Sequence, residues 1–347
     1  NFATNKLTIQ RNSHKIQGVA NDGEIGTNRA ALTLVYIDAT KGWLYTNESN
    51  VADLQQATYI AATGGTITTS GDYKTHVFTG DGNFVVSSIG NAAGGPSIVD
   101  YLVVAGGGDG TVGGGGGGGF RTSNSSPRSG IPAVSPLDTS TGITVTATSF
   151  PITVGAANGN PSVFSTITSA GGGGGPHYVS NPLNGQSGGS GGGAGGAGNS
   201  RGTGGAGNTP PVSPPQGQPG GNATGPNRPT PIHGGAGGGA TGAGGNGGQG
   251  SGGAGAPVAT AFFGPTSGCY GTPGPSAGRW FAGGGGTNAT SQANNGGAGG
   301  GGHGGGQNAT GGFFAGTANT GGGGGGSSVQ GGPGGKGIVA IRYKFQN

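Results

Sequence analysis

The sequence Gly-Gly-Gly-Gly-Gly at residues 171–175 opens a segment, 171–336, in which glycine dominates. Glycine disfavours an α-helix by roughly 1 kcal/mol per residue, and it gives an ordinary strand no side chain to pack. The segment is therefore either a disordered linker or a bundle of polyproline-II helices in which bare backbones touch. Its glycine runs, with one forerunner upstream, are Gly171–Gly175, Gly191–Gly193, Gly237–Gly239, Gly283–Gly286, Gly299–Gly302, Gly321–Gly326 and Gly113–Gly119.

Side chains in this segment recur at every third residue, which is the period of a polyproline-II helix. One edge of such a helix would carry the side chains, and its bare edges could pack on other helices through backbone hydrogen bonds and Cα–H···O contacts. Collagen has the same period, but it needs a strict Gly-X-Y repeat, which the all-glycine runs break. Two series have this spacing: Ala194, Ala197, Ser200, Thr203 and Ala206, and then Ala240, Ala243, Asn246 and Gln249.

Composition limits how much of the chain an ordinary hydrophobic core can cover. The 347 residues include 95 glycines and 21 prolines, and only 7% are charged, against roughly 25% in typical globular proteins. All ten acidic residues lie at or before Asp138, so residues 1–138 carry 8 − 10 = −2 and the remainder carries +6. This sparse positive charge would favour an anionic cell surface, but it lacks the clustered Lys and Arg of a nucleic-acid interface.

Strand-like patterns lie on both sides of the glycine segment. Residues 1–50 predict a small β-rich module, 51–61 a linker or helical turn, 62–170 a β-sheet part, 171–336 the glycine bundle with its tip loops, and 337–347 a closing strand. A free linker needs no closing strand, whereas pairing the last strand with an early one would pin both ends of the glycine region to one sheet. We therefore predict an all-β fold, essentially without α-helix, in which a β-sheet domain encloses a polyproline-II bundle.

The N-terminal module has few apolar side chains, so it should be marginal as a monomer, and self-association would bury the missing area. Its motifs resemble the small trimeric β-modules of bacteriophage tail fibres over residues 1–45. The resemblance implies a homotrimer. The motifs that carry it are Leu7–Asn12, Ile16–Gly18, Ala31–Asp38 and Gly42–Trp43.

The rest of the chain, about 62–347, resembles the glycine-rich C-terminal domains of phage tail fibres and tail-tip adhesins. The resemblance implies packed polyproline-II helices whose variable tip loops contact a receptor. It also implies a virion protein, outside the cell, that joins the rest of the tail fibre and binds a bacterial surface glycan or outer-membrane protein. Sheet, glycine run and closing strand occur in order in Tyr73–Val86, Val99–Gly108, Gly113–Arg121 and Gly337–Phe345.

Catalytic and metal-binding patterns are missing from the sequence. No carboxylate follows Asp138, so a paired-carboxylate glycosidase is impossible within the glycine region. An enzyme would have to use Asp72, Asp81 or Asp100, and turn formation is the ordinary role of aspartate at such positions. The five histidines show no metal-ligand spacing, and a Gly-x-Gly-x-x-Gly match is uninformative in a chain so rich in glycine. We expect no enzymatic activity, no cofactor or metal, no nucleic-acid partner and no membrane insertion.

Aromatic residues stand between the glycine runs, among proline, asparagine and threonine. Such loops suit stacking on sugars or contact with a protein; alternatively, the rings form a thin hydrophobic rim that closes the bundle. Both interpretations stay open for the two phenylalanine pairs, whereas Tyr178, Tyr270 and Trp280 favour binding. The candidate receptor-binding residues are His177, Tyr178, Phe262, Phe263, Tyr270, Trp280, Phe281, Phe313 and Phe314.

Two other classes of protein are alternatives to a receptor-binding module. One is a self-assembling extracellular filament or matrix protein, stiffened by its glycine helices. The other is an ice-binding protein, which would not need the Trp and Phe pairs. A receptor-binding module predicts one closed end with variable loops, whereas a filament predicts complementary surfaces at both ends.

Overall fold

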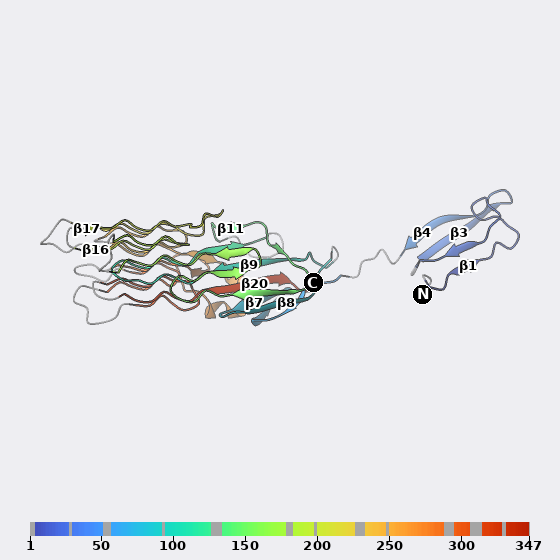
Figure 1. The fold of residues 1–347 in the computed structure, drawn as a ribbon. Coiled ribbons are helices and arrows are strands. Elements are labelled where there is room, and N and C mark those ends of the chain that lie inside the picture. The colour runs from blue at the N-terminus through green and yellow to red at the C-terminus, as the bar shows by residue number, and fades with distance from the viewer. Residues whose placement is uncertain are drawn as a thin grey trace. The chain divides into compact units, whose positions relative to one another are not determined.

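The computed structural model describes residues 4–27, 30–50, 57–91, 94–125, 134–177, 183–197, 200–225, 233–247, 250–287, 295–305, 314–327 and 331–346. The chain forms two compact units, Asn1–Thr58 with Asn91–Gly94, and Tyr59–Gly90 with Gly95–Asn347 (Figure 1). The expected linker or helical turn at 51–61 falls largely outside the described residues. Within the described ranges, none of the helices has the length and apolar composition that a membrane crossing needs.

The first unit is built from two antiparallel strand pairs. Its polar turn is fixed by Asp38, whose carboxylate accepts the amides of Thr40 and Lys41 at 2.7 and 2.6 Å. These hydrogen bonds, that of Lys41 first, lower the pKa of Asp38. Ile16 is the only buried hydrophobic side chain among the described residues of this unit. The strand pairs are β1 (Leu7–Ile9) with β2 (Gly23–Ile25), and β3 (Ala30–Asp38) with β4 (Gly42–Asn50).

The second unit contains two main sheets, besides the two-stranded pairs β16-β17 (Gly196–Ala197 with Ser200–Arg201) and β18-β19 (Ala256–Val258 with Arg279–Phe281). The larger has the strand order β11-β10-β9-β20-β7-β6, with β12 beside β9, and the smaller has the order β15-β14-β13-β8-β5. The larger sheet consists of β6 (Thr66–Ser70), β7 (Tyr73–Phe78), β9 (Ile98–Val104), β10 (Phe120–Ser123), β11 (Asp138–Thr139), β12 (Ile143–Thr144) and β20 (Ile338–Lys344). The smaller sheet consists of β5 (Ala61–Thr63), β8 (Gly82–Ser88), β13 (Ser149–Thr153), β14 (Ser162–Phe164) and β15 (Ile167–Ser169).

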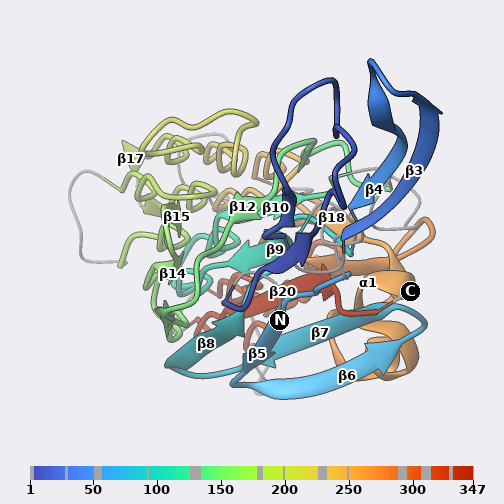
Figure 2. The ribbon, with the colours of Figure 1, turned by 90° about the vertical axis from the view of Figure 1, so that its right-hand side faces the viewer.

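The last strand of the chain occupies the middle of the larger sheet. β20 pairs antiparallel with both β7 and β9, as Figure 2 shows. Ile338, which follows the glycine segment, lies opposite Val104, which precedes it. Both ends of the glycine region are therefore held on neighbouring strands, and the all-β fold predicted from the sequence is confirmed.

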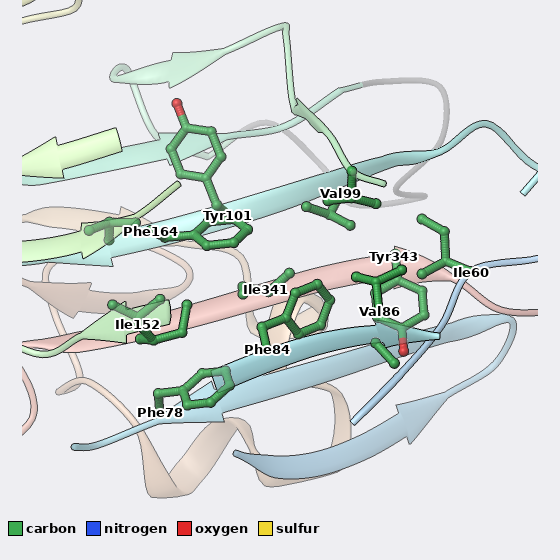
Figure 3. Close-up of a cluster of buried hydrophobic side chains, with 14 of the residues drawn as sticks. Ile60, Phe78, Phe84, Val86, Val99, Tyr101, Ile152, Phe164, Ile341 and Tyr343 are labelled. Atoms are coloured by element: carbon green, nitrogen blue, oxygen red, sulfur yellow. The ribbon is translucent and has the colours of Figure 1, made fainter. Parts of the chain in front are cut away.

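The two sheets enclose the main hydrophobic core (Figure 3). Alternation along β20 places Val339, Ile341 and Tyr343 in this core, because successive side chains of a strand point to opposite faces. From the smaller sheet, Phe84 and Phe164 are fully buried, with ring centroids 6.1 Å apart and an edge-to-face arrangement. The core is thus an ordinary sandwich core, independent of the glycine segments.

A second buried cluster covers the other face of the larger sheet. It is formed by an insertion between glycine segments that contains β18 (Ala256–Val258), α1 (Thr260–Phe263), the 3-10 helix η2 (Gly264–Cys269) and β19 (Arg279–Phe281). The hydroxyl of Thr75 donates to the carbonyl of Phe262 at 2.7 Å. The guanidinium of Arg342 donates to the carbonyl of Ala261 and lies 4.2 Å from the Tyr73 ring centroid, and burial lowers the pKa of Arg342 to about 10.

The glycine region is a lattice of parallel and antiparallel extended helices. Its central segment, 113–119, donates successive amides to three neighbouring segments in turn, and returns to the same neighbour after three residues. That repeat is the three-residue turn of a polyproline-II helix. Backbone amides of three further segments donate to its carbonyls, so bonded neighbours surround it. The donated bonds run from Gly114 and Gly117 to Gly235 and Gly238, from Gly115 and Gly118 to Gly324 and Gly321, and from Gly116 and Gly119 to Gly173 and Ala170; the accepted bonds come from Ala105, Gly108, Ser190, Gly193 and Gly285.

Close approach of these backbones explains why the central positions are glycine. A Cβ atom added to Gly115 would lie 2.0 Å from the carbonyl oxygen of Gly108, and one added to Gly118 would lie 2.1 Å from that of Ala105. Real Cβ atoms do not come so near to backbone. The obstacle at each site is another backbone already fixed by hydrogen bonds, so neither partner can move away.

Side chains appear where a segment faces solvent, and some of them complete the lattice. The side-chain oxygens of Asn184, Asn222 and Asn246 accept the amides of Thr203, Gly204 and Asn222 at 2.9, 2.9 and 2.8 Å. Without the asparagine oxygen, a backbone amide at the edge would need a carbonyl from one more glycine helix as its acceptor. Asparagine therefore closes the edge of the lattice, as capping residues close the end of a helix.

The two period-three series do not each follow one helix, as the sequence suggested. The chain reverses at β16 (Gly196–Ala197) and β17 (Ser200–Arg201), so Ala194 and Thr203 lie on different segments. Ala194 and Ala240 are fully buried, whereas Thr203 is exposed. The period persists because both segments have three residues per turn, but the lattice position of each segment decides whether a side chain meets solvent.

Replacing a lattice glycine should be far more destabilising than replacing a surface glycine. We expect Gly115→Ala to lower the free energy of unfolding by about 3 kcal/mol or more, because its Cβ would collide with fixed backbone. The matched control is Gly268→Ala, where an added Cβ meets no atom within 4 Å, and where we expect a change within about 0.5 kcal/mol. Denaturant unfolding measures both; equal stabilities for the two variants would contradict the lattice.

His76 should make the stability of the second unit depend on pH. Its ring is fully buried, Nδ1 donates to the carbonyl of Gly64 at 2.7 Å, and the Tyr343 hydroxyl donates to Nε2 at 3.0 Å. Burial lowers the pKa of His76 below 6.5, so the unfolded chain binds the proton first as pH falls. Wild type should therefore lose stability relative to His76→Gln between about pH 7 and pH 5, as measured by denaturant unfolding; a constant difference would refute this.

Candidate receptor-binding site

The glycine segments run alternately away from the sheets and back towards them, so the far ends of many described segments lie together at one end of the bundle (Figure 1). Segment 106–111 leads outward from β9, and 113–119 leads back into β10. The same alternation continues to β20. We call this end, away from the sheets, the loop end. Described residues at or near the far ends of these segments are His177, Leu183, Arg201, Thr224, His233, Thr287, His303, Phe314 and Ser327.

The loop end combines a small apolar closure with cationic and hydroxyl groups. Val112 and Leu183 are buried there; a Cβ on Gly195 would lie 3.4 Å from Leu183 and 3.5 Å from Val112. His177, Arg201 and His303 are exposed, and the carboxylate of Asp109, on the outward segment 106–111, accepts the amide of Gly334 at 2.9 Å. The surface is therefore suited to neutral or anionic ligands rather than to cations.

Four of the candidate receptor-binding side chains lie elsewhere and are buried; for Phe262 and Phe263 this favours the packing alternative that the sequence left open, and for Trp280 it corrects the expected exposure. Phe262, Phe263 and Phe281 pack in the cluster on the outer face of the larger sheet. Trp280 is also buried, and its indole donates to the carbonyl of Ser276 at 3.2 Å. Sequence reasoning placed these rings on loops because glycine runs flank them, but the insertion folds back on the sheet, where its rings remove apolar surface from water.

The other candidates have different outcomes. Tyr270 is half-buried against Phe263, with ring centroids 5.2 Å apart, and desolvation raises the pKa of its hydroxyl. Its carbonyl accepts a hydrogen bond from Arg279 at 2.7 Å, which ties it to the insertion. His177 and Phe314 are exposed at the loop end. Tyr178 and Phe313 lie outside the described residues.

The sequence did not indicate that Asp100 and Asp138 line the same small cavity, beneath Phe262. Asp100 is buried and accepts the hydroxyl of Ser123 and the amide and hydroxyl of Ser125, each at 2.9 Å. Burial, and secondarily the charge of Asp100, raises the pKa of Asp138 to about 6. Asp100 was one of the acids considered from the sequence, whereas Asp138 was not, because only the pairing of β10 with β11 brings it close.

This pair of carboxylates has no room for a sugar substrate. The cavity that it lines has a volume of about 10 Å³, which is roughly the space of one water molecule. Asp81, another acid considered from the sequence, accepts the amide of Val154 at 2.8 Å. No group of three or more potential metal-ligating His, Cys, Asp or Glu side chains occurs in the part of the chain that the structure describes.

The match to known proteins covers the sheets and the bundle together. A family model described as a glycine-rich domain matches residues 79–344, from the end of β7 to the end of β20. Among curated proteins, none matches this chain. Because the family model spans more than half of the chain, this protein belongs to the glycine-rich domain family.

Proposed function

We propose that this chain is a distal module of a phage tail fibre, carried on the virion, that binds a bacterial surface glycan or outer-membrane protein without doing chemistry. The single observation that supports this proposal best is the loop end, where the far ends of many segments are held side by side by one backbone hydrogen-bond lattice. Binding residues are commonly carried on loops held by a rigid scaffold. A scaffold whose backbone is already ordered also lowers the entropic cost of binding.

The sides of the bundle support this function over a self-assembling filament. A filament needs complementary surfaces that continue from one molecule to the next. Here, instead, the edge amides that could have donated to a carbonyl of another glycine helix already donate to side-chain oxygens, which belong to Asn184, Asn222 and Asn246. The sheets occupy the opposite end. Trp280 is buried, so its presence in the sequence does not count against ice binding. The exposed side chains along the asparagine edge of the bundle are, however, of different chemical types, whereas an ice surface repeats regularly.

Three copies of the chain assembling through the first unit would complete the module. Among the described residues of this unit, Ile16 is the only buried hydrophobic side chain, while β3 exposes Val35 to 42% and Ile37 to 52%. Leu44 is paired with Val35 across the two strands. Burial of this strip by neighbouring copies would supply the hydrophobic area that the unit lacks, and three joined binding ends would raise the apparent affinity for a surface.

Charge placed on this strip should separate the copies. We expect wild type to have the mass of a trimer in light scattering, and Val35→Glu with Ile37→Glu to be a monomer, because three buried carboxylate pairs cannot be solvated. Thr40→Glu in the exposed turn is the control and should remain trimeric. A monomeric wild type would refute the assembly.

Binding to bacteria tests the proposed function directly. Fluorescently labelled full-length protein should bind some strains of a bacterial panel, and the monomeric variant should bind the same strains at least about a hundredfold more weakly through lost multivalency. Incubation with polysaccharide from a bound strain should release no reducing ends. Binding to no strain, or fibres of indefinite length in electron micrographs, would contradict the proposal, and released reducing ends would overturn its non-enzymatic part.

A further inference from the structure

Phe314 is the most exposed aromatic side chain among the described residues, with 52% of its surface accessible. It lies at the loop end, next to the exposed side chain of His303. The two ring centroids are 5.7 Å apart, and the ring planes meet at 83°, so the edge of one ring faces the other.

The lattice holds this pair rigidly. The carbonyl of Phe314 accepts the amide of Gly325 at 3.0 Å, and the amide of Phe314 donates to the carbonyl of His303 at 3.4 Å. The amide of Gly296 donates to Nδ1 of His303 at 3.4 Å. Because Nδ1 accepts a hydrogen bond, the proton of the neutral imidazole is placed on Nε2, where it can be donated.

Two described neighbours of the pair, Gly302 and Gly332, offer only backbone. A Cβ on Gly302 would lie 2.1 Å from the carbonyl oxygen of Phe314, and a Cβ on Gly332 would lie 2.4 Å from the same atom. These neighbours therefore present no side chain that could cover the ring. Their amides are used within the lattice, Gly302 by Gly323 and Gly332 by Gly325. Among the described residues, the pair thus offers one flat apolar ring and, beside it, one ring N–H donor.

We propose that Phe314 and His303 form a subsite for a single sugar ring of a bacterial surface glycan. The C–H face of a pyranose would pack on the phenyl ring, whose face is electron-rich, and Nε2–H of His303 would donate to a ring hydroxyl. One phenyl ring is far smaller than the roughly 800 Å² per partner of a protein–protein interface, but it matches one pyranose. This inference rests on the proposed function and selects the glycan over the outer-membrane protein as its receptor.

The test measures binding of the full-length protein to two probes from a strain that it binds. One probe is the surface polysaccharide, freed of lipid and protein, and the other is the detergent-solubilised outer-membrane protein fraction. We expect wild type to bind the polysaccharide, Phe314→Ala to bind it about tenfold more weakly, and Phe314→Trp to remain within about twofold because stacking is kept. His303→Ala should lose about fivefold, the contribution of one hydrogen bond.

The matched control is Ile67→Ala, which removes an exposed apolar side chain from β6; its affinity should equal that of wild type. All variants should melt at the wild-type temperature. Wild-type affinity in both Phe314→Ala and His303→Ala would overturn the subsite, and binding to the protein fraction alone would overturn the glycan; both results would leave the proposed function standing. Failure to bind any bacterial cell would overturn both proposals.

Discussion

Hydrogen bonding between bare backbones in several directions at once is the interaction on which the second unit depends. A β-strand bonds to neighbours on two sides, whereas the segment 113–119 donates to three segments and accepts from three others. This is possible because successive amides of a three-residue turn point in three directions. It also demands glycine, since the carbonyl of Gly108 occupies the place that a Cβ on Gly115 would take. The hydrogen-bonded lattice therefore requires the glycine-rich composition, and neither can change without the other.

Such a lattice is weakly stabilised by itself. Ordering one backbone residue costs about 1–2 kcal/mol, glycine costs the most, and a typical net hydrogen bond contributes about 0.5–1.5 kcal/mol. The sandwich offsets this deficit, because its buried rings and aliphatic side chains lie beside the lattice and fix its ends. Val104 and Ile338 hold the first exit and the last return on adjacent strands, and the insertion at α1 attaches another pair of segments to the same sheet.

The division of labour between sandwich and lattice bears on function. Hydrophobic side chains are used near the sheets, where Phe262, Phe281 and Trp280 are buried. The lattice then projects a scaffold with few side chains away from that core, and the far ends of its segments lie together at the loop end. Few described groups at that end are both exposed and chemically distinctive. Phe314 and His303 are therefore prominent for a physical reason, as their described neighbours Gly302 and Gly332 offer only backbone.

The sequence by itself determined the kind of structure. Glycine runs excluded helices and ordinary strands, and the alternating stretch at 338–345 predicted a closing strand that pins the region to a sheet. The spacing of side chains at every third residue, as at Thr203 and Ala206, indicated helices with three residues per turn. These properties can be read from short stretches of sequence, because they depend only on whether the residues of one segment carry a Cβ atom.

Only the tertiary structure decided which segments are neighbours and which aromatic rings meet solvent. Glycine segments are chemically alike, so nothing in their sequence states that Gly115 bonds to Gly324 rather than to another run. Phe262-Phe263 and Phe314 have similar glycine-rich flanks, yet the first pair folds onto the larger sheet and Phe314 stays exposed. The proximity of Asp100 to Asp138 and of His303 to Phe314 likewise depends on pairing between distant segments, which composition and periodicity cannot specify.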